Sequence, residues 1–296
     1  MTRPALGSTL GQLARQEIRR YAVHPLFWFG ATLTLVLAGF GAAGQSGERG
    51  RTALDGLGPA FTLGVLGIVV MAGLVRDSDR AAAAAGTVTV PERTRTLALA
   101  ASAVVPLTVA LGWFVAAAYG YLAYPSSPDS TFAATSDVFV LTVLFSQGVV
   151  SAVGGPVLGL VLARWFPRRW VPPIVAVLVV VVTVAFNGDQ AWNAAWREVW
   201  VWTHFHGPLG MWSVEPDPLR WAVLPGSVFW YVGYQLALCA LGVLFAVYHD
   251  AECDRRVVVR LGTGLLAVAL VLCVLAVVGG QPEIVYNPIP SPDAGG

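Results

Sequence analysis

The chain of 296 residues is apolar, with 56% hydrophobic residues, 12% charged residues and a mean hydropathy of +0.67. About a quarter of the residues of a soluble globular protein are charged, so this composition indicates a membrane protein. All 18 basic residues are arginine, because the sequence contains no lysine. The lack of lysine excludes a P-loop, whose lysine contacts nucleotide phosphates, and any Schiff base formed on a lysine.

Residues 7–22 have the pattern of a helix that lies in the membrane interface. One stripe of this helix is apolar and consists of Leu10, Leu13, Ala14, Ile18 and Tyr21. Its charged residues are Arg15, Glu17, Arg19 and Arg20, and the arginines are expected to face away from the apolar stripe. Residues 1–25 are therefore expected to form a cytoplasmic N-terminus, whose polar lead is too long for a cleavable signal peptide.

Seven stretches are apolar enough for transmembrane helices, which need about 20 residues each. They are 26–44, 57–75, 96–124, 138–163, 171–186, 227–248 and 261–280, of which the fifth is short. We therefore predict an all-α polytopic membrane protein with about seven transmembrane helices in residues 26–280. Pro106 and the run Gly154-Gly155-Pro156 are expected to kink their helices. Residues 281–296, rich in proline and glycine, are expected to be a disordered extracellular tail.

The distribution of arginine predicts the orientation of these helices. If seven helices alternate, one side of the membrane receives only Arg49, Arg51, Arg197 and Arg220. The other side receives Arg3, Arg15, Arg19, Arg20, Arg76, Arg80, Arg93, Arg95, Arg164, Arg168, Arg169, Arg255, Arg256 and Arg260. Arginine-rich segments favour the cytoplasm, so we expect a plasma-membrane protein with a cytoplasmic N-terminus and an extracellular C-terminus.

The predicted spans carry few polar groups. No Asp, Glu, Arg or His lies well within any of them, and Asp137 and His249 are at edges. Ionisable groups inside a membrane are costly and persist mainly where function requires them, so their absence argues against an ion-coupled transporter. The spacing of Gly155 and Gly159 fits either close packing of two helices or a kink with small residues beside it.

The segment 191–212 is rich in tryptophan and is expected on the outer side. Trp192, Trp196 and Trp200 recur at four-residue spacing, which is typical of a helix at the level of the lipid headgroups. Alternatively, His204 and His206 could ligate haem or a metal ion. We prefer the interfacial interpretation and expect no metal site in the chain. The cysteines lack metal-site spacing and are interpreted as packing residues.

A charged strip, residues 76–96, separates the second and third predicted spans. Its charged residues are Arg76, Asp77, Asp79, Arg80, Glu92, Arg93 and Arg95. The alanines at 81–85 favour a helix, Gly86 can end one, and Pro91 can begin the next element. The pattern predicts a short polar helix on the cytoplasmic side, with an ordinary solvated loop as the alternative.

Four segments together resemble the ABC-2 type permeases, the transmembrane subunits of type V exporter-like ABC transporters. Leu13 to Arg20, followed by His24-Pro25, is similar to the interfacial helix that leads into the first span of that family. Asp79-Arg80, Gly86-Thr87 and the run from Pro91 to Arg95 resemble its strip between spans two and three. Residues 187–225 resemble its outer re-entrant segment, and Leu224-Pro225 with Trp230-Tyr231 and Tyr234 resembles a late-span pattern. The seventh span, 261–280, departs from the six spans of most members.

The resemblance implies a permease subunit that is not an enzyme and exports an amphiphilic or hydrophobic substrate. ATP and Mg²⁺ would be bound by a separate ATPase that docks on the seven charged residues of the strip, with residues 250–260 as a second contact. A second copy or a related permease would complete the pathway, and the three tryptophans would lie at the outer gate. The alternatives are a haem- or metal-handling protein that uses His204 and His206, and a structural or immunity-type membrane protein. No nucleic acid partner is expected.

Overall fold

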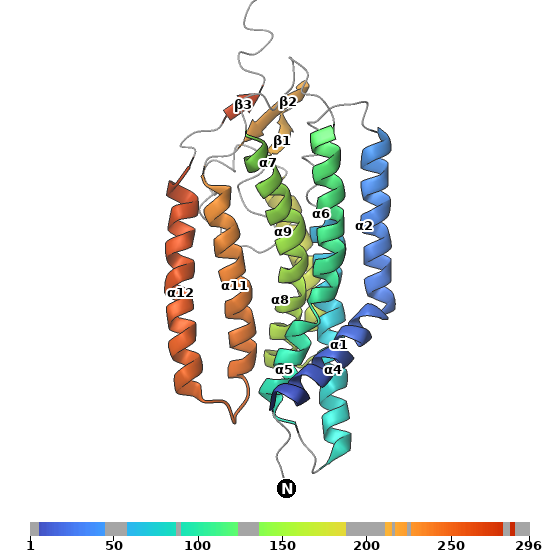
Figure 1. Cartoon of the computed structure of the whole chain (residues 1–296), viewed down its shortest axis with the longest axis vertical. Helices are drawn as coiled ribbons and strands as arrows, with labels where there is room; N and C mark the ends of the chain where they lie inside the picture. Colours follow the sequence, from blue (N-terminus) through green and yellow to red (C-terminus); the bar gives the residue numbers. More distant parts are fainter. Residues whose placement is uncertain are drawn as a thin grey trace, which may run out of the picture.

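The computed structural model describes residues 6–44, 58–86, 90–123, 136–187, 211–214, 217–223, 226–280 and 285–287. Long helices run side by side along the molecule, and a short sheet lies at one end (Figure 1). The predicted helical class is therefore confirmed, with a small sheet in addition.

Among the described residues, five helical stretches are long and apolar enough to cross a membrane. They are Ala60–Ala85, Glu92–Ala123, Asp137–Trp165, Val228–Tyr248 and Arg255–Val278. A sixth results if helices α1 (Leu6–Ala22) and α2 (Pro25–Gly44) form one bent span. Helix α9 (Val171–Asn187) has 17 residues and is about 26 Å long, somewhat less than the ~30 Å of the hydrocarbon core. The exact count of seven spans stays a prediction.

Helices α1 and α2 meet at a bend of 61°. The bend is at His24, whose Nδ1 accepts a hydrogen bond from the backbone N of Leu26 at 3.2 Å. Pro25 begins α2, a position where its missing N–H costs nothing. The apolar stripe of α1 turns inward and ends in Tyr21, which is buried, whereas Arg15 is exposed. The predicted amphipathic N-terminal helix is present.

The charged strip does not form a helix of its own. A π-helical segment, η2 (Ala60–Val65), leads into α4 (Leu66–Ala85), which continues through the charged residues and ends before Gly86. No helix-breaking residue separates Val75 from Gly86, and extending a helix is easier than starting one. Pro91 then precedes α5 (Glu92–Ala101). The predicted end at Gly86 and start after Pro91 are confirmed, and the separate polar helix is wrong.

The third predicted span is broken near its first residues. Helix α5 ends at Ala101, and α6 (Val104–Ala123) begins after Ser102 and Ala103. Pro106 lacks the N–H that would bond to the carbonyl of Ser102, and the Ser102 hydroxyl donates to the Leu99 carbonyl at 2.6 Å. The kink predicted from Pro106 is therefore present, one turn before the proline.

Two glycines bring α4 and its neighbour into close contact. The fourth predicted span consists of α7 (Asp137–Leu144), the π-helical η3 (Phe145–Val150) and α8 (Ser151–Trp165). A Cβ on Gly155 would overlap the carbonyl of Gly64, and one on Gly159 would overlap the carbonyl of Ile68. Close helix packing, one of the two alternatives predicted from this spacing, is therefore present.

Hydroxyl and amide groups join the helices inside the bundle. The hydroxyls of Thr34 and Thr62 are 2.5 Å apart and connect α2 to η2. The hydroxyl of Ser146 in η3 donates to Oε1 of Gln235 in α11 (Val228–Tyr248) at 2.7 Å. Such hydrogen bonds stabilise helix contacts in membranes, and they satisfy polar groups that lipid cannot.

The last helix, α12 (Arg255–Val278), packs against α11 at the side of the bundle (Figure 1). Only 11% of its apolar stretch is buried in the protein. An antiparallel sheet at the far end has the order β1 (Met211–Val214), β2 (Asp217–Val223) and β3 (Val285–Asn287). Strand β3 pairs with residues 221–223 of β2. The prediction of a disordered tail is therefore wrong for Val285–Asn287.

Candidate functional site

The helix ends and turns that carry the described arginine side chains lie at one end of the bundle, the lower end in Figure 1, which we call the arginine-rich end. These side chains come from α1, the last turns of α4, the start of α5, the end of α8 and the turn after it, and the start of α12. The arginines whose side chains the structure describes are Arg15, Arg19, Arg20, Arg76, Arg80, Arg93, Arg95, Arg164, Arg168, Arg169, Arg255, Arg256 and Arg260. The one-sided distribution predicted from the sequence is present in the fold.

At the centre of the arginine-rich end, a buried arginine joins helices. Arg164 at the end of α8 has a side chain only 2% exposed. Its Nη1 donates to both carboxylate oxygens of Asp79 in α4, at 2.8 and 3.0 Å. Arg95 in α5 donates from its own Nη1 to Asp79 Oδ1 at 2.8 Å. One carboxylate therefore lies between two guanidinium groups, in the charge-assisted geometry that gives strong hydrogen bonds.

The same group of charges extends to the end of α11. Glu92, the first residue of α5, lies 3.7 Å from Nη1 of Arg164 and 2.7 Å from Nδ1 of His249. The buried carboxylate of Asp250 accepts a hydrogen bond from the backbone N of Arg93 at 2.7 Å. Asp250 thereby caps the start of α5, where free N–H groups and the helix dipole favour a carboxylate.

We call Asp79, Glu92, Arg95, Arg164, His249 and Asp250 the buried ion cluster after its two buried members, Arg164 and Asp250; the other four side chains are partly exposed. Nε of Arg95, and Nε and Nη2 of Arg164, are buried and have no hydrogen-bond partner among the described atoms. Buried donors without acceptors are uncommon in proteins. Because these N–H groups are not bonded, the two arginines can form hydrogen bonds with the carboxylates in more than one arrangement. The contacts between α4, α5 and α8 are therefore suited to rearrangement.

Ion pairs also connect α1 to α4. Both carboxylate oxygens of the buried Glu17 accept from Nη1 of Arg20, at 3.0 and 3.1 Å. Arg20 also reaches Asp77 at 3.5 Å, and Asp77 accepts from Arg80 at 3.2 Å. Burial raises the pKa of the Glu17 carboxyl, and the charge of Arg20 opposes that rise. The prediction that Arg20 faces away from the bundle is wrong, because Glu17 and Asp77 attract it inward.

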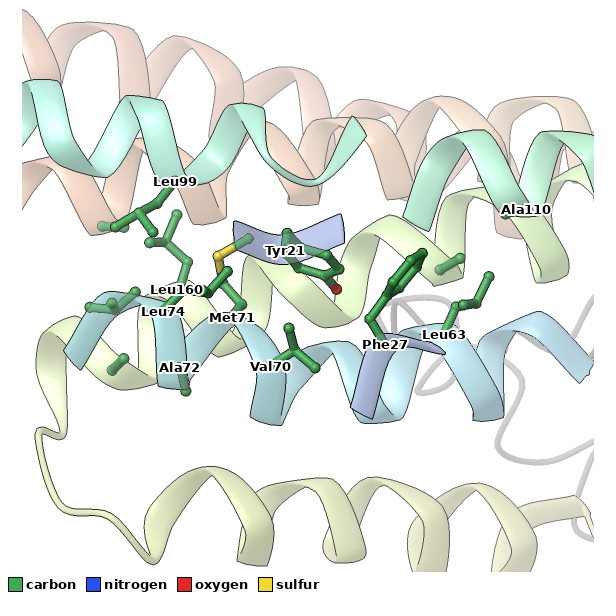
Figure 2. Packing of buried hydrophobic residues seen from close by; sticks show 14 of the residues in the cluster. Tyr21, Phe27, Leu63, Val70, Met71, Ala72, Leu74, Leu99, Ala110 and Leu160 are labelled. Atoms are coloured by element: carbon green, nitrogen blue, oxygen red, sulfur yellow. The ribbon is translucent and has the colours of Figure 1, made fainter. Parts of the chain in front are cut away.

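Tyr21 anchors the end of α1 in the core (Figure 2). Its side chain is buried, and its ring meets that of Phe27 edge to face, with centroids 5.5 Å apart. Met71 and Val70 of α4 belong to the same cluster of buried residues. A displacement of α1 must therefore displace its neighbours in α2 and α4.

The residues predicted to dock an ATPase fall into two groups. Asp79, Glu92 and Arg95 belong to the buried ion cluster; Asp79 keeps 43% of its side chain exposed, but its oxygens are engaged by arginines. The second group is Arg76, Asp77, Arg80 and Arg93, of which Arg76 is partly exposed and the others are exposed. The second group is the part of the predicted site that another protein could contact.

Sequence patterns do not single out Arg164, His249 or Asp250 as site residues. Arg164 contributes to the arginine count of one side, and His249 is noticed only as a residue at an edge. The signal that could identify them is their position, because each ends or directly follows an apolar run on the same side as the charged strip. Their partners are up to 157 residues away along the chain.

The residues predicted for the outer gate, Trp192, Trp196 and Trp200, lie outside the described residues, as do His204 and His206. The gate and the haem- or metal-handling alternative stay predictions. Within the described part of the chain, no group of three or more His, Cys, Asp and Glu side chains could hold a metal ion.

Comparisons with known proteins do not place the chain in a family. No family model matches it, no curated protein matches it, and no solved structure matches it. Its function must therefore be argued from the arginine-rich end itself.

Proposed function

We propose that this chain is the transmembrane permease subunit of an ATP-driven transporter, moved by a separate ATP-hydrolysing protein that docks on the arginine-rich end. One observation carries the proposal: two exposed arginines, one in α4 and one in α5, each directly follow a residue of the buried ion cluster in the sequence. Arg80 is exposed and follows Asp79, and Arg93 is exposed and follows Glu92. A partner that grips Arg80 and Arg93 would act on the neighbouring residues that bind α8 and α11.

The movement passes from the docking surface into the membrane through rigid contacts. A displacement of Asp79 pulls on Arg164 and therefore on α8. The glycine contacts hold α8 against η2 and the start of α4, so these segments move as one body. The exposed Arg15 and Arg19 of α1 offer a second contact, and Tyr21 transmits its displacement to α4.

The proposal includes an external energy source and an amphiphilic or hydrophobic cargo. Without lysine the chain has no P-loop, and in the described spans the ionisable side chains lie toward the ends. The buried polar side chains within the described helices include the hydroxyls of Thr34, Thr62, Ser146 and Ser151 and the amide of Gln235, which carry no charge and suit a cargo with little charge. The positive-inside rule assigns the arginine-rich end to the cytoplasm, where ATP is available. A second copy or a related permease completes the pathway.

The test begins with the full chain purified gently from its own host, with identification of any ATP-binding protein that accompanies it. The double variant Arg80→Glu/Arg93→Glu should then lose that protein and at least 90% of ATP-dependent transport, because both docking charges are reversed. The control Arg168→Glu/Arg169→Glu changes the net charge equally at the same end, in the exposed turn between α8 and α9. The control should keep both the partner and transport.

Two results would contradict the proposal. One is full transport and partner retention in Arg80→Glu/Arg93→Glu. The other is translocation of cargo by the isolated chain in vesicles, driven by an ion gradient without ATP. A haem absorbance band from the purified chain would favour the alternative based on His204 and His206.

A further inference from the structure

A groove between α11 and α12 opens at the arginine-rich end. Its volume is about 280 Å³. Its walls include Leu241, Phe245 and Tyr248 of α11 and Val258, Gly262 and Leu266 of α12. Apart from the hydroxyls of Tyr248 and Thr263 these walls are apolar. Between Leu241 and Tyr248 the groove runs about 10 Å along the helix, from the end of the bundle toward the level of the membrane core.

Three arginines, Arg255, Arg256 and Arg260, lie in the first turns of α12, whose residues from Val258 onward line the groove. The guanidinium carbon of Arg255 is 5.6 Å from the ring centroid of Tyr248, which lines the groove. Arg256 and Arg260 are exposed on the first turns of α12, and within the described part of the chain no carboxylate forms an ion pair with any of the three.

The nearby acids form no ion pair with these arginines in the described part of the chain. Asp254 caps α12, since its carboxylate accepts from the backbone N of Arg256 at 3.1 Å and that of Val257 at 3.3 Å. Asp250 is buried and turned to the backbone N of Arg93. Glu252 is exposed in the same turn. The formal charges of these three acids balance those of the three arginines, but the guanidinium groups form no ion pair with a described carboxylate and stay available beside the apolar groove.

We propose that this groove binds an anionic glycerophospholipid, with an acyl chain along the apolar walls and the phosphate at Arg255 and Arg256. Guanidinium groups bind phosphate through paired hydrogen bonds, and arginine clusters beside membrane helices attract anionic lipids. Only 11% of the apolar stretch of α12 is buried in the protein, so an acyl chain in the groove would bury apolar surface that α12 otherwise exposes. The inference requires only that these helices span the membrane, and it is independent of the proposed ATPase partner.

A second copy of the chain fits the groove less well than a lipid does. In a two-fold dimer the same surface of each copy meets its equivalent. Contact along this groove would then bring Arg255, Arg256 and Arg260 of one copy close to the same arginines of the other. Like charges oppose such a contact, whereas a lipid phosphate neutralises them.

The first experiment compares charge variants of the full chain. Each is reconstituted in vesicles of phosphatidylglycerol and phosphatidylcholine, and the retained lipid is counted by native mass spectrometry. Arg255→Gln/Arg256→Gln should reduce retention of phosphatidylglycerol about 30-fold, because each arginine at a membrane surface contributes roughly a factor of five. Arg168→Gln/Arg169→Gln is the control, since Arg168 also lies near an aromatic ring, 5.8 Å from that of Trp170, away from the groove. This control should retain the lipid.

The second experiment fills the groove without changing charge. A Cβ on Gly262 meets nothing within 4 Å, and Gly262 lines the groove, so Gly262→Leu should place its side chain where the acyl chain lies. Gly264 in the same helix has equal space but is not part of the groove walls, which makes Gly264→Leu a matched control. Gly262→Leu should lose the phosphatidylglycerol and Gly264→Leu should keep it, with both variants folded.

Several outcomes would overturn the proposal. Equal loss of lipid in both arginine variants would show only general attraction to an anionic membrane. Displacement of the lipid by inorganic phosphate at millimolar concentration would identify a phosphate site. If Gly262→Leu kept its lipid but changed the oligomeric state, the groove would belong to an interface with a second copy.

Discussion

The charged side chain of Arg164 is almost completely shielded from water by its neighbours. Its side chain is 2% exposed, and Asp79 supplies its closest acceptors. Removing one partner of a buried ion pair leaves the other charge without compensation. This destabilises a protein far more than replacing both partners by apolar residues does. Arg164 is therefore the residue on which the junction of α4, α5 and α8 depends most.

Substitution of Arg164 by methionine should destabilise the fold by about 3 kcal/mol, the lower end of the range for buried pairs, because Asp79 is partly exposed. The double variant Arg164→Met/Asp79→Leu should lose less than the sum of the two single changes, since the residues share one contact. Reversible unfolding in detergent measures these differences. Arg168→Met, in an exposed position, should change little. Strictly additive losses would mean that the two side chains do not interact.

Residue composition indicates that such charges are important but not which of them pair. Asp79 and Arg164 are 85 residues apart, and Arg93 and Asp250 are 157 apart. These contacts form only when α4, α5, α8 and α11 come together in the fold. A local sequence pattern contains no information about such long-range contacts. Sequence patterns therefore predict the helix end at Gly86 and the helix start after Pro91, but they do not predict which residues of the strip face the bundle.

At the scale of helices, the contact of α8 with η2 and the start of α4 is the closest backbone approach that the glycines report. A Cβ at Gly155 or Gly159 would overlap a backbone carbonyl of the opposite element, which cannot move away as a side chain can. Apolar runs predict that these helices exist, and glycine spacing predicts the contact. The change from apolar to charged residues at residue 76 suggests that the helix ends there. This is wrong, because α4 continues to Ala85.

Alanine at Gly155 should force α8 away from η2, the segment that leads into α4, and destabilise the protein by about 1–3 kcal/mol, the usual cost of overpacking. Gly73→Ala in α4 is the matched control, because a Cβ there meets nothing within 4 Å and alanine favours a helix. The control should be as stable as the parent or more stable. Thermal unfolding of the variants in the same detergent measures the difference. Equal behaviour of Gly155→Ala and Gly73→Ala would disprove the close contact.

At the scale of the whole molecule, the fold separates a charged end from an end with a small sheet (Figure 1). This separation follows from composition, because arginines cluster at alternate ends of the apolar runs. The sheet does not follow from composition, since β3 pairs with β2 across a sequence separation that contains α11 and α12. Orientation in a membrane then depends on one further rule, the preference of arginine for the cytoplasm.

That rule can be tested with single cysteines at the two ends, after Cys239, Cys253 and Cys273 are replaced by alanine. Ala84 is exposed near the end of α4, and Ala123 is exposed at the far end of α6. In intact cells a membrane-impermeant maleimide should label Ala123→Cys at once and Ala84→Cys only after permeabilisation. The opposite pattern would place the arginine-rich end outside the cell, where no ATP-hydrolysing subunit can reach Arg80 and Arg93. The proposed docking and the predicted topology therefore depend on the same labelling result.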